Sequence, residues 1–210
     1  MSSLDFFFKE LNYTPLDEAL LSRASLPEFP YEEQLEIEKK VDETPELRRQ
    51  IVETPNGRIK TAYYYNKKVV DEELINAARE TLQLTGYDRK ETNMVRQWVW
   101  GGDCLSAHTD ENRQCQFIYI LDTGGEGIQT SWYMEPGKPV ARKWKRYLTC
   151  INDTRHLIKL CSVVLKPKTW YYFNTAIIHD VQNIQAMRNA LCVDMPASHP
   201  LHILKPLDWK

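Results

Sequence analysis

The sequence lacks an apolar run long enough to cross a bilayer, and its N-terminus has neither the basic nor the apolar region of a secretory signal. The formal net charge is only −2, which provides no long-range attraction to nucleic acid or to an anionic membrane. We therefore expect a soluble, cytoplasmic protein with no membrane partner and no nucleic-acid partner. The oligomeric state is left open.

The five cysteines are odd in number and scattered, and no two of them have the C-x-x-C spacing. This pattern argues against a disulfide framework and against a zinc site of the finger type, and it is typical of reduced thiols in a cytosol. No internal repeat or low-complexity stretch is present. A chain of 210 residues is long enough for one core and short for two, so we expect a single domain.

The first 90 residues carry few periodic signals. Residues 58–65 alternate in character after a Pro-Asn-Gly turn signal, which predicts a strand. Apolar residues recur at helical spacing over 71–84, with Asp71 placed as N-cap and Gly86 just past the end. We expect residues 1–90 to form N-terminal helices and a strand that pack on a core.

From residue 94 the character changes to short apolar strands separated by turn signals. With a return strand that follows Arg188, they make about seven strands in a row and do not alternate with helices. This order favours a β-sandwich or a jelly roll. The predicted strands are 94–100, 115–121, 128–134, 147–151, 157–165 and 170–176.

A candidate metal site begins with His108-Thr109-Asp110. In an extended segment the side chains of His108 and Asp110 share one face, where they can present a nitrogen and an oxygen to a metal. His179 ends an apolar strand, and a jelly roll can bring it beside this pair. Two histidines and one carboxylate on one side of a metal leave open positions opposite, which suits Fe(II) and oxygen. The alternatives are a surface turn for the first pair and an ordinary strand-end histidine for His179.

Arg188 lies nine residues after His179, on the returning strand of a hairpin. If the hairpin is regular, its side chain enters the same cavity. A buried guanidinium needs an acidic partner, and no paired carboxylate is evident nearby in sequence. The simplest partner is a dicarboxylate ligand that bridges from Arg188 to the metal. The alternative is an arginine in a surface salt bridge.

In order and spacing these residues resemble the His-x-Asp…His…Arg set of the Fe(II)/2-oxoglutarate-dependent dioxygenases. Gly102-x-x-Leu105 resembles the approach to the first histidine in their prolyl-hydroxylase-like branch, and Phe117–Asp122 with the following Gly124-Gly125-Glu126 also resembles the family. The likeness covers about residues 93–195. It implies a mainly β protein with flanking helices, built on a double-stranded β-helix, which is a cupin-like jelly roll.

The resemblance also implies roles for individual residues. His108, Asp110 and His179 would be the catalytic iron ligands, and Arg188 would bind the distal carboxylate of 2-oxoglutarate, whose keto acid end chelates Fe(II). O2 would be the oxidant, with ascorbate as an optional reductant, and succinate and CO2 the co-products. Halogenating relatives carry a small residue in place of the carboxylate, so Asp110 favours hydroxylation.

Two further residues complete the predicted cofactor site. Gln116 shares a face with Ile120 by parity and is predicted to contribute a hydrogen bond, and Trp98 is predicted to wall the pocket, although ordinary core explains Trp98 equally well. Relatives usually carry a tyrosine for 2-oxoglutarate where this strand has Ile120. Tyr119 is one residue off and is expected to point outward.

The first hypothesis is therefore a 2-oxoglutarate-dependent non-haem iron dioxygenase that hydroxylates a small molecule or a peptidyl residue such as proline. The second is a non-catalytic jelly-roll protein that binds a metal or a carboxylate, and the third is a non-haem iron oxygenase that uses no keto acid. A role for Arg188 in binding a keto acid distinguishes the first hypothesis from the third, and catalytic turnover distinguishes the first from the second. We expect the catalytic core to span 91–197, with 198–210 as a tail.

Overall fold

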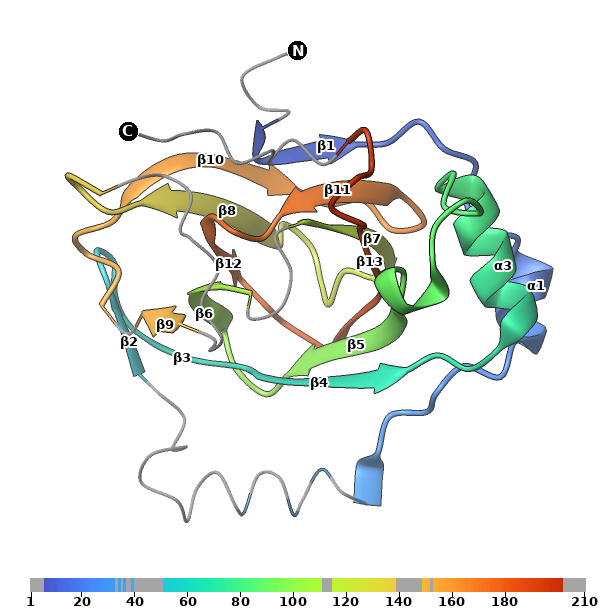
Figure 1. Ribbon diagram of the computed structural model, residues 1–210. Helices are drawn as coiled ribbons and strands as arrows, with labels where there is room; N and C mark the ends of the chain where they lie inside the picture. The colour runs from blue at the N-terminus through green and yellow to red at the C-terminus, as the bar shows by residue number, and fades with distance from the viewer. Residues whose placement is uncertain are drawn as a thin grey trace.

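The computed structural model describes residues 6–32, 34, 36, 39, 51–110, 115–138, 149–151 and 153–201. Two antiparallel sheets of six and five strands pack face to face (Figure 1), with two α-helices among the described elements. The mainly β fold with flanking helices is thus confirmed as a jelly roll. None of the described helices is long and apolar enough to span a membrane.

The six-stranded sheet, called here the major sheet, has the strand order β1-β11-β7-β13-β5-β4. The five-stranded minor sheet has the order β10-β8-β12-β6-β9, and β2 (Ile51–Thr54) and β3 (Gly57–Lys60) form a separate ribbon. The bounds in the major sheet are β1 Phe8–Glu10, β4 Tyr63–Lys68, β5 Met94–Trp100, β7 Cys115–Asp122, β11 Trp170–Asn174 and β13 Arg188–Asp194. Those in the minor sheet are β6 Cys104–Thr109, β8 Gln129–Met134, β9 Thr149–Ile151, β10 Ile158–Val164 and β12 Ile178–Gln182.

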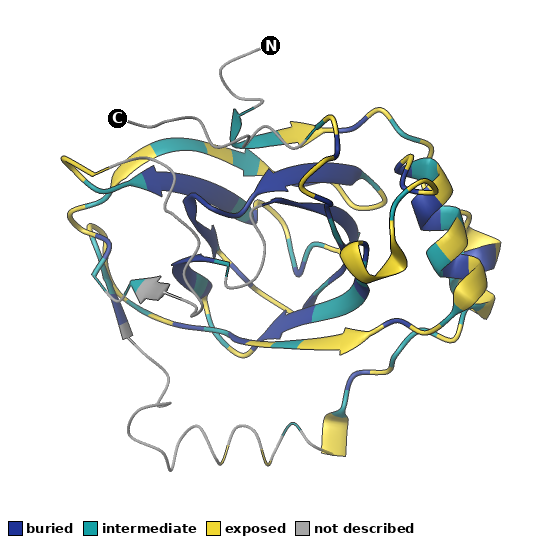
Figure 2. Ribbon diagram, viewed as in Figure 1, coloured by how far each residue is buried: buried dark blue, intermediate teal, exposed yellow. Residues whose placement is uncertain are grey.

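The central strands of the major sheet are buried on both faces (Figure 2), which explains why they read as continuous apolar runs. On β7, Phe117 and Tyr119 face the helices, while Ile118 and Ile120 face the minor sheet and share a cluster with Trp132. The space between the sheets is therefore the interior in which a site can form.

Two α-helices, α1 (Glu18–Arg23) and α3 (Glu72–Thr81), lie side by side and share one core cluster (Figure 1). The short 3-10 helix η2 (Arg89–Glu91) comes after α3 in the chain. The Asp71 side chain caps α3 by accepting a hydrogen bond from the backbone N–H of Leu74 at 2.9 Å. The apolar stripe of α3 is buried against the outer face of the major sheet. The helix predicted from the spacing of apolar residues is thus present, and it covers the back of the core.

The N-terminal part of the chain supplies both edge strands of the major sheet, β1 and β4. The strand predicted over 58–65 is divided into β3 and β4, because the backbone N–H of Ala62 turns to donate to the Cys104 carbonyl at 2.6 Å. Gly102 permits this close passage, since a Cβ there would lie 2.3 Å from the Thr61 oxygen. The predicted strand 147–151 is β9, with 147 and 148 outside the described residues, as are 202–210 of the tail.

Replacing Leu74 with alanine tests the packing of α3 on the major sheet. Leu74 is fully buried in the largest core cluster, so the variant should lose about 2 to 5 kcal/mol of unfolding free energy, measured by urea denaturation. Glu80→Ala, at an exposed position of the same helix, is the control and should change stability by less than about 0.5 kcal/mol. Equal small effects would contradict the described packing.

Candidate metal centre

The register of the minor sheet places three rings in one row. His179 on β12 pairs with His108 on β6 at one side and with Trp132 on β8 at the other. Directly paired residues point to the same face of a sheet, so all three rings face the interior. The two imidazole centroids are 4.4 Å apart. Strand pairing thus joins two histidines that are far apart in sequence.

Asp110 follows the last residue of β6 and completes the cluster. Its backbone N–H donates to the Thr175 carbonyl at 3.1 Å, which fixes this residue to the chain that leads into β12. Its Oδ1 lies 3.5 Å from Nε2 of His108 and 3.7 Å from Nε2 of His179. The three potential ligand atoms all lie within 4.8 Å of one another. The structure therefore brings the predicted triad together.

Both imidazoles are oriented by their other ring nitrogen. Nδ1 of His108 is 2.6 Å from the Ser106 carbonyl, and Nδ1 of His179 is 2.9 Å from the Ile177 carbonyl. Because a carbonyl only accepts, each Nδ1 carries a proton, and in the neutral form of each ring Nε2 keeps its lone pair. Both lone pairs are then available at the side where Asp110 lies, as in metal-binding histidines oriented by a backbone acceptor.

The triad is largely shielded from water. His108 and His179 are buried, and the Asp110 side chain is only 13% exposed. Burial lowers the pKa of the His108 imidazole, but the hydrogen bonds to Asp110 and to the Ser106 carbonyl, with the negative charges of Asp110 and Asp180, together raise it above its ordinary value. A metal ion at the triad would take the place of a proton on His108 Nε2. Two imidazole nitrogens and one carboxylate oxygen on one side of a point form a donor set that could hold a divalent metal ion and would leave open positions for other ligands.

The outer face of β12 carries a second polar cluster that does not enter the interior. Asp180 is buried there, and its Oδ2 accepts hydrogen bonds from the Tyr133 hydroxyl at 2.9 Å and from Nε2 of Gln182 at 2.7 Å. Burial raises the pKa of the Asp180 carboxyl to about 6. The bond from Tyr133 joins β8 to β12 on the outer face, next to His179, and Nε2 of Gln182 also donates to the Tyr133 hydroxyl at 3.1 Å.

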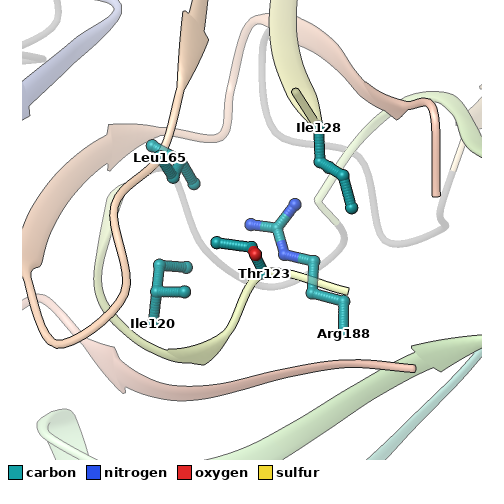
Figure 3. Close-up of a pocket in the computed structure, with 5 residues that line it drawn as sticks. All are labelled: Ile120, Thr123, Ile128, Leu165 and Arg188. Atoms are coloured by element: carbon teal, nitrogen blue, oxygen red, sulfur yellow. The ribbon is translucent and has the colours of Figure 1, made fainter. Parts of the chain in front are cut away.

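Arg188, at the start of β13, is buried, and its guanidinium points into a small hollow between the sheets (Figure 3). Burial lowers the pKa of its guanidinium to about 10, which leaves it charged at neutral pH. Its Nη1 makes no hydrogen bond, and no carboxylate within the described parts of the chain forms an ion pair with it. The other residues that line the hollow are Ile120, Thr123, Ile128 and Leu165.

The hollow and the triad belong to one interior. Val181 lies two residues beyond His179 on the same face of β12, and it packs in one buried cluster with Val99 and Ile128. Val99 is the direct cross-strand neighbour of Arg188, and Ile128 lines the hollow. A single layer of apolar side chains therefore connects the Arg188 hollow with the row of histidines.

The other two predicted site residues lie elsewhere. Trp98 does not wall the hollow, because it pairs with Asn189 rather than with Arg188 and packs on the outer face of the major sheet with Phe29. Gln116 is buried on the inner face of β7 but does not line the hollow either. It lies opposite Phe173, one position from Asn174 and thus toward the triad, and its role stays a prediction.

Ile120 and its neighbour Tyr119 lie on opposite faces of β7. Ile120 lines the Arg188 hollow, whereas Tyr119 packs on the opposite face of β7 beside Trp170, as parity predicted. Thr123 is the one hydroxyl group among the residues that line the hollow, and it currently donates to the Gly125 carbonyl at 2.8 Å. Sequence reasoning did not find Thr123, because it lies in the turn after the predicted strand.

No protein-family model matches the chain, and no curated protein sequence matches it. Among solved structures it is similar to E. coli ycfD, at 14% identity and TM-score 0.41, over 66% of this chain and 35% of that chain. It is also similar to Bacillus subtilis oxalate decarboxylase (11%, TM-score 0.34, 71% and 28%) and to a cupin-like protein of Thermotoga maritima (12%, TM-score 0.31, 70% and 78%). The chain thus spans well under half the length of the first two. Its fold follows from its own strand order, and its function is inferred from its side chains.

Replacing His179 with alanine tests the metal centre. Loss of one of three ligands should weaken Co(II) binding by more than about 100-fold, beyond the effect of losing an outer-shell partner. Binding is measured by titration calorimetry and by the visible Co(II) spectrum. His156→Ala is the control, because this histidine lies on the surface with its side chain 49% exposed. Similar affinities in both variants would show that the ion binds elsewhere.

Proposed function

We propose that the protein is an Fe(II)- and 2-oxoglutarate-dependent dioxygenase. The proposal is supported by the His108, Asp110 and His179 donor set and by a charged pocket in the same interior. A metal bound by three donors on one side keeps positions for a chelating keto acid and for O2. The bound iron and keto acid would supply the oxidative chemistry, with succinate and CO2 as co-products, while the protein binds, orients and excludes water.

The observation that carries the proposal is the buried Arg188 guanidinium. A desolvated charge is costly unless a counter-charge pairs with it, and no described carboxylate does so. A ligand carboxylate in the hollow would accept two hydrogen bonds from the guanidinium in the favoured bidentate geometry. The arginine thus indicates a ligand with an acidic end, bound within the fold.

The other side chains around Arg188 indicate the chemical character of the rest of that ligand. Ile120, Ile128 and Leu165 provide an apolar lining suited to methylene groups beside the carboxylate. The other end of the ligand would reach the triad, where an adjacent keto and carboxylate group chelate a metal. A keto dicarboxylic acid satisfies both ends, which favours 2-oxoglutarate over a monocarboxylic keto acid. A metal oxygenase that uses no keto acid would have no use for Arg188.

Asp110 bears on the outcome of the reaction. Its carboxylate occupies the third ligand position, so no site is left there for a halide, and hydroxylation is the favoured reaction. We propose a small molecule or a peptidyl residue such as proline as the substrate. A metal- or carboxylate-binding protein without turnover has the same donor set, and only the oxygen-dependent formation of succinate separates the two.

Replacing Arg188 with alanine should weaken 2-oxoglutarate binding to the Mn(II)-loaded protein by roughly 100-fold, since loss of one partner of a buried charge pair costs about 2 to 5 kcal/mol. Mn(II) affinity itself should not change. Titration calorimetry with 2-oxoglutarate and with 2-oxobutyrate, which lacks the distal carboxylate, measures both effects. The wild-type preference for the dicarboxylate should disappear in the variant.

Arg96→Ala is the matched control, because Arg96 is a half-buried arginine on β5 that donates to the Pro27 carbonyl at 2.8 Å and lies over the Trp98 ring. It should keep the preference for 2-oxoglutarate. With Fe(II) and O2, the wild-type protein should release succinate, and Arg188→Ala should not. Unchanged 2-oxoglutarate affinity in Arg188→Ala would refute the assignment of the hollow.

A further inference from the structure

Trp132 is fully buried between the two sheets and contacts rings from both of them. From the major sheet, Phe8 lies nearly parallel to it, with ring centroids 5.2 Å apart and planes at 16°, and Phe173 meets it edge to face at 5.1 Å. From the minor sheet, the His179 imidazole lies 6.5 Å away with its plane at 28°. Such separations are typical of favourable aromatic pairs.

Phe8 reaches this position from the edge of the major sheet. It lies on β1, which runs beside β11 (Figure 1), and in the register of this pair Phe8 is directly opposite Phe173. Both rings consequently point to the same face, toward the minor sheet, and press on Trp132 together. The N-terminal strand thereby touches the row of rings that contains His179.

Hydrogen bonds of Asn174 attach the same segment to the centre. Nδ2 of Asn174 donates to the Phe6 carbonyl at 3.0 Å, and its backbone N–H donates to the Phe7 carbonyl at 2.9 Å. Its own carbonyl accepts from Nε1 of Trp132 at 3.2 Å. The next residue, Thr175, accepts the backbone N–H of Asp110. Two consecutive residues thus connect the N-terminal segment, the indole and the metal-binding loop.

The His179 ring lies between two other rings and a backbone carbonyl. The bond from Nδ1 to the Ile177 carbonyl restrains one edge of the ring. The tilt is limited by neighbours on both sides, His108 at 4.4 Å and Trp132 at 6.5 Å. On the side of the major sheet, Trp132 in turn packs against Phe8 and Phe173, and Phe8 makes the near-parallel contact.

We propose that Phe8 is a positioning residue of the metal centre, which holds the His179 imidazole in its ligating orientation through Trp132. The inference rests on the proposed function only in that His179 binds a metal. The N-terminal strand β1 supplies no metal ligand, yet it would raise the metal affinity of the triad through this contact.

The test is Co(II) binding to full-length Phe8→Ala, followed by calorimetry and by the visible Co(II) spectrum. Affinity should fall about tenfold, as for loss of an outer-shell partner, and the spectrum should change as the coordination geometry relaxes. Phe8→Tyr, which keeps the ring, should restore both. Phe8→Leu keeps apolar bulk without a ring, so it preserves folding if Phe8→Ala is unstable and should still show the altered spectrum.

Phe7→Ala is the matched control, because Phe7 belongs to the same segment and core cluster, while the ring that it meets edge to face is Phe6. It should lower stability without altering the Co(II) spectrum. Tryptophan fluorescence adds a local readout: Co(II) should quench Trp132, so Trp132→Phe should lose most of the quenching. Trp170→Phe, equally buried but on the helix-facing side of the major sheet, should keep it.

The outcomes separate the inference from the function on which it rests. If Phe8→Ala and Phe8→Leu bind Co(II) with wild-type affinity and spectrum while His179→Ala does not bind, the metal centre stands and the positioning role is refuted. Parallel changes in Phe7→Ala and Phe8→Ala would also refute it, because the effect would then be general loss of packing. If His179→Ala binds Co(II) normally, the centre itself is wrong and the inference fails with it.

Discussion

The pairing register of β12 with its two neighbours is the constraint on which the candidate site depends. It places Trp132, His179 and His108 side by side on one face of the minor sheet. Side chains alternate between faces, so a slip of one residue in β12 would turn His179 to the outer face and bring Asp180 inside. On the outer face, the bonds that Tyr133 of β8 makes with Asp180 and Gln182 of β12 stabilise the observed register.

The second feature is a buried positive charge that the fold retains. Arg188 sits among apolar side chains with one nitrogen unsatisfied, an arrangement that lowers the stability of the protein without a ligand. Gly124 leaves room for the Arg188 side chain, since a Cβ at Gly124 would lie 3.0 Å from Cβ of Arg188. The backbone of Gly124, at φ +83, also suits glycine. A ligand carboxylate would supply the missing charge, and this links the stability of the protein to its occupancy.

Much of the site could be predicted because its signals are local. Alternation along a strand relates His108 to Asp110, and the order of strands in a jelly roll relates both to His179 and Arg188. Other features depend on registers that no local pattern contains. Trp98 was predicted to wall the pocket, but the pairing of β5 with β13 places it opposite Asn189, on the outer face of the major sheet. Trp132 was not predicted, because only the pairing of β8 with β12 brings it beside His179. Phe8 was missed because a three-residue edge strand has no periodicity to detect.

The central claim is that a metal at the triad and a carboxylate at Arg188 hold the two ends of one ligand. The most direct measurement is the absorption spectrum of the anaerobic protein with Fe(II) and 2-oxoglutarate. Chelation of Fe(II) by the keto acid should produce a weak visible charge-transfer band that requires both components and is absent with succinate. Tight Fe(II) binding at the triad with no such band at saturating 2-oxoglutarate would contradict the account.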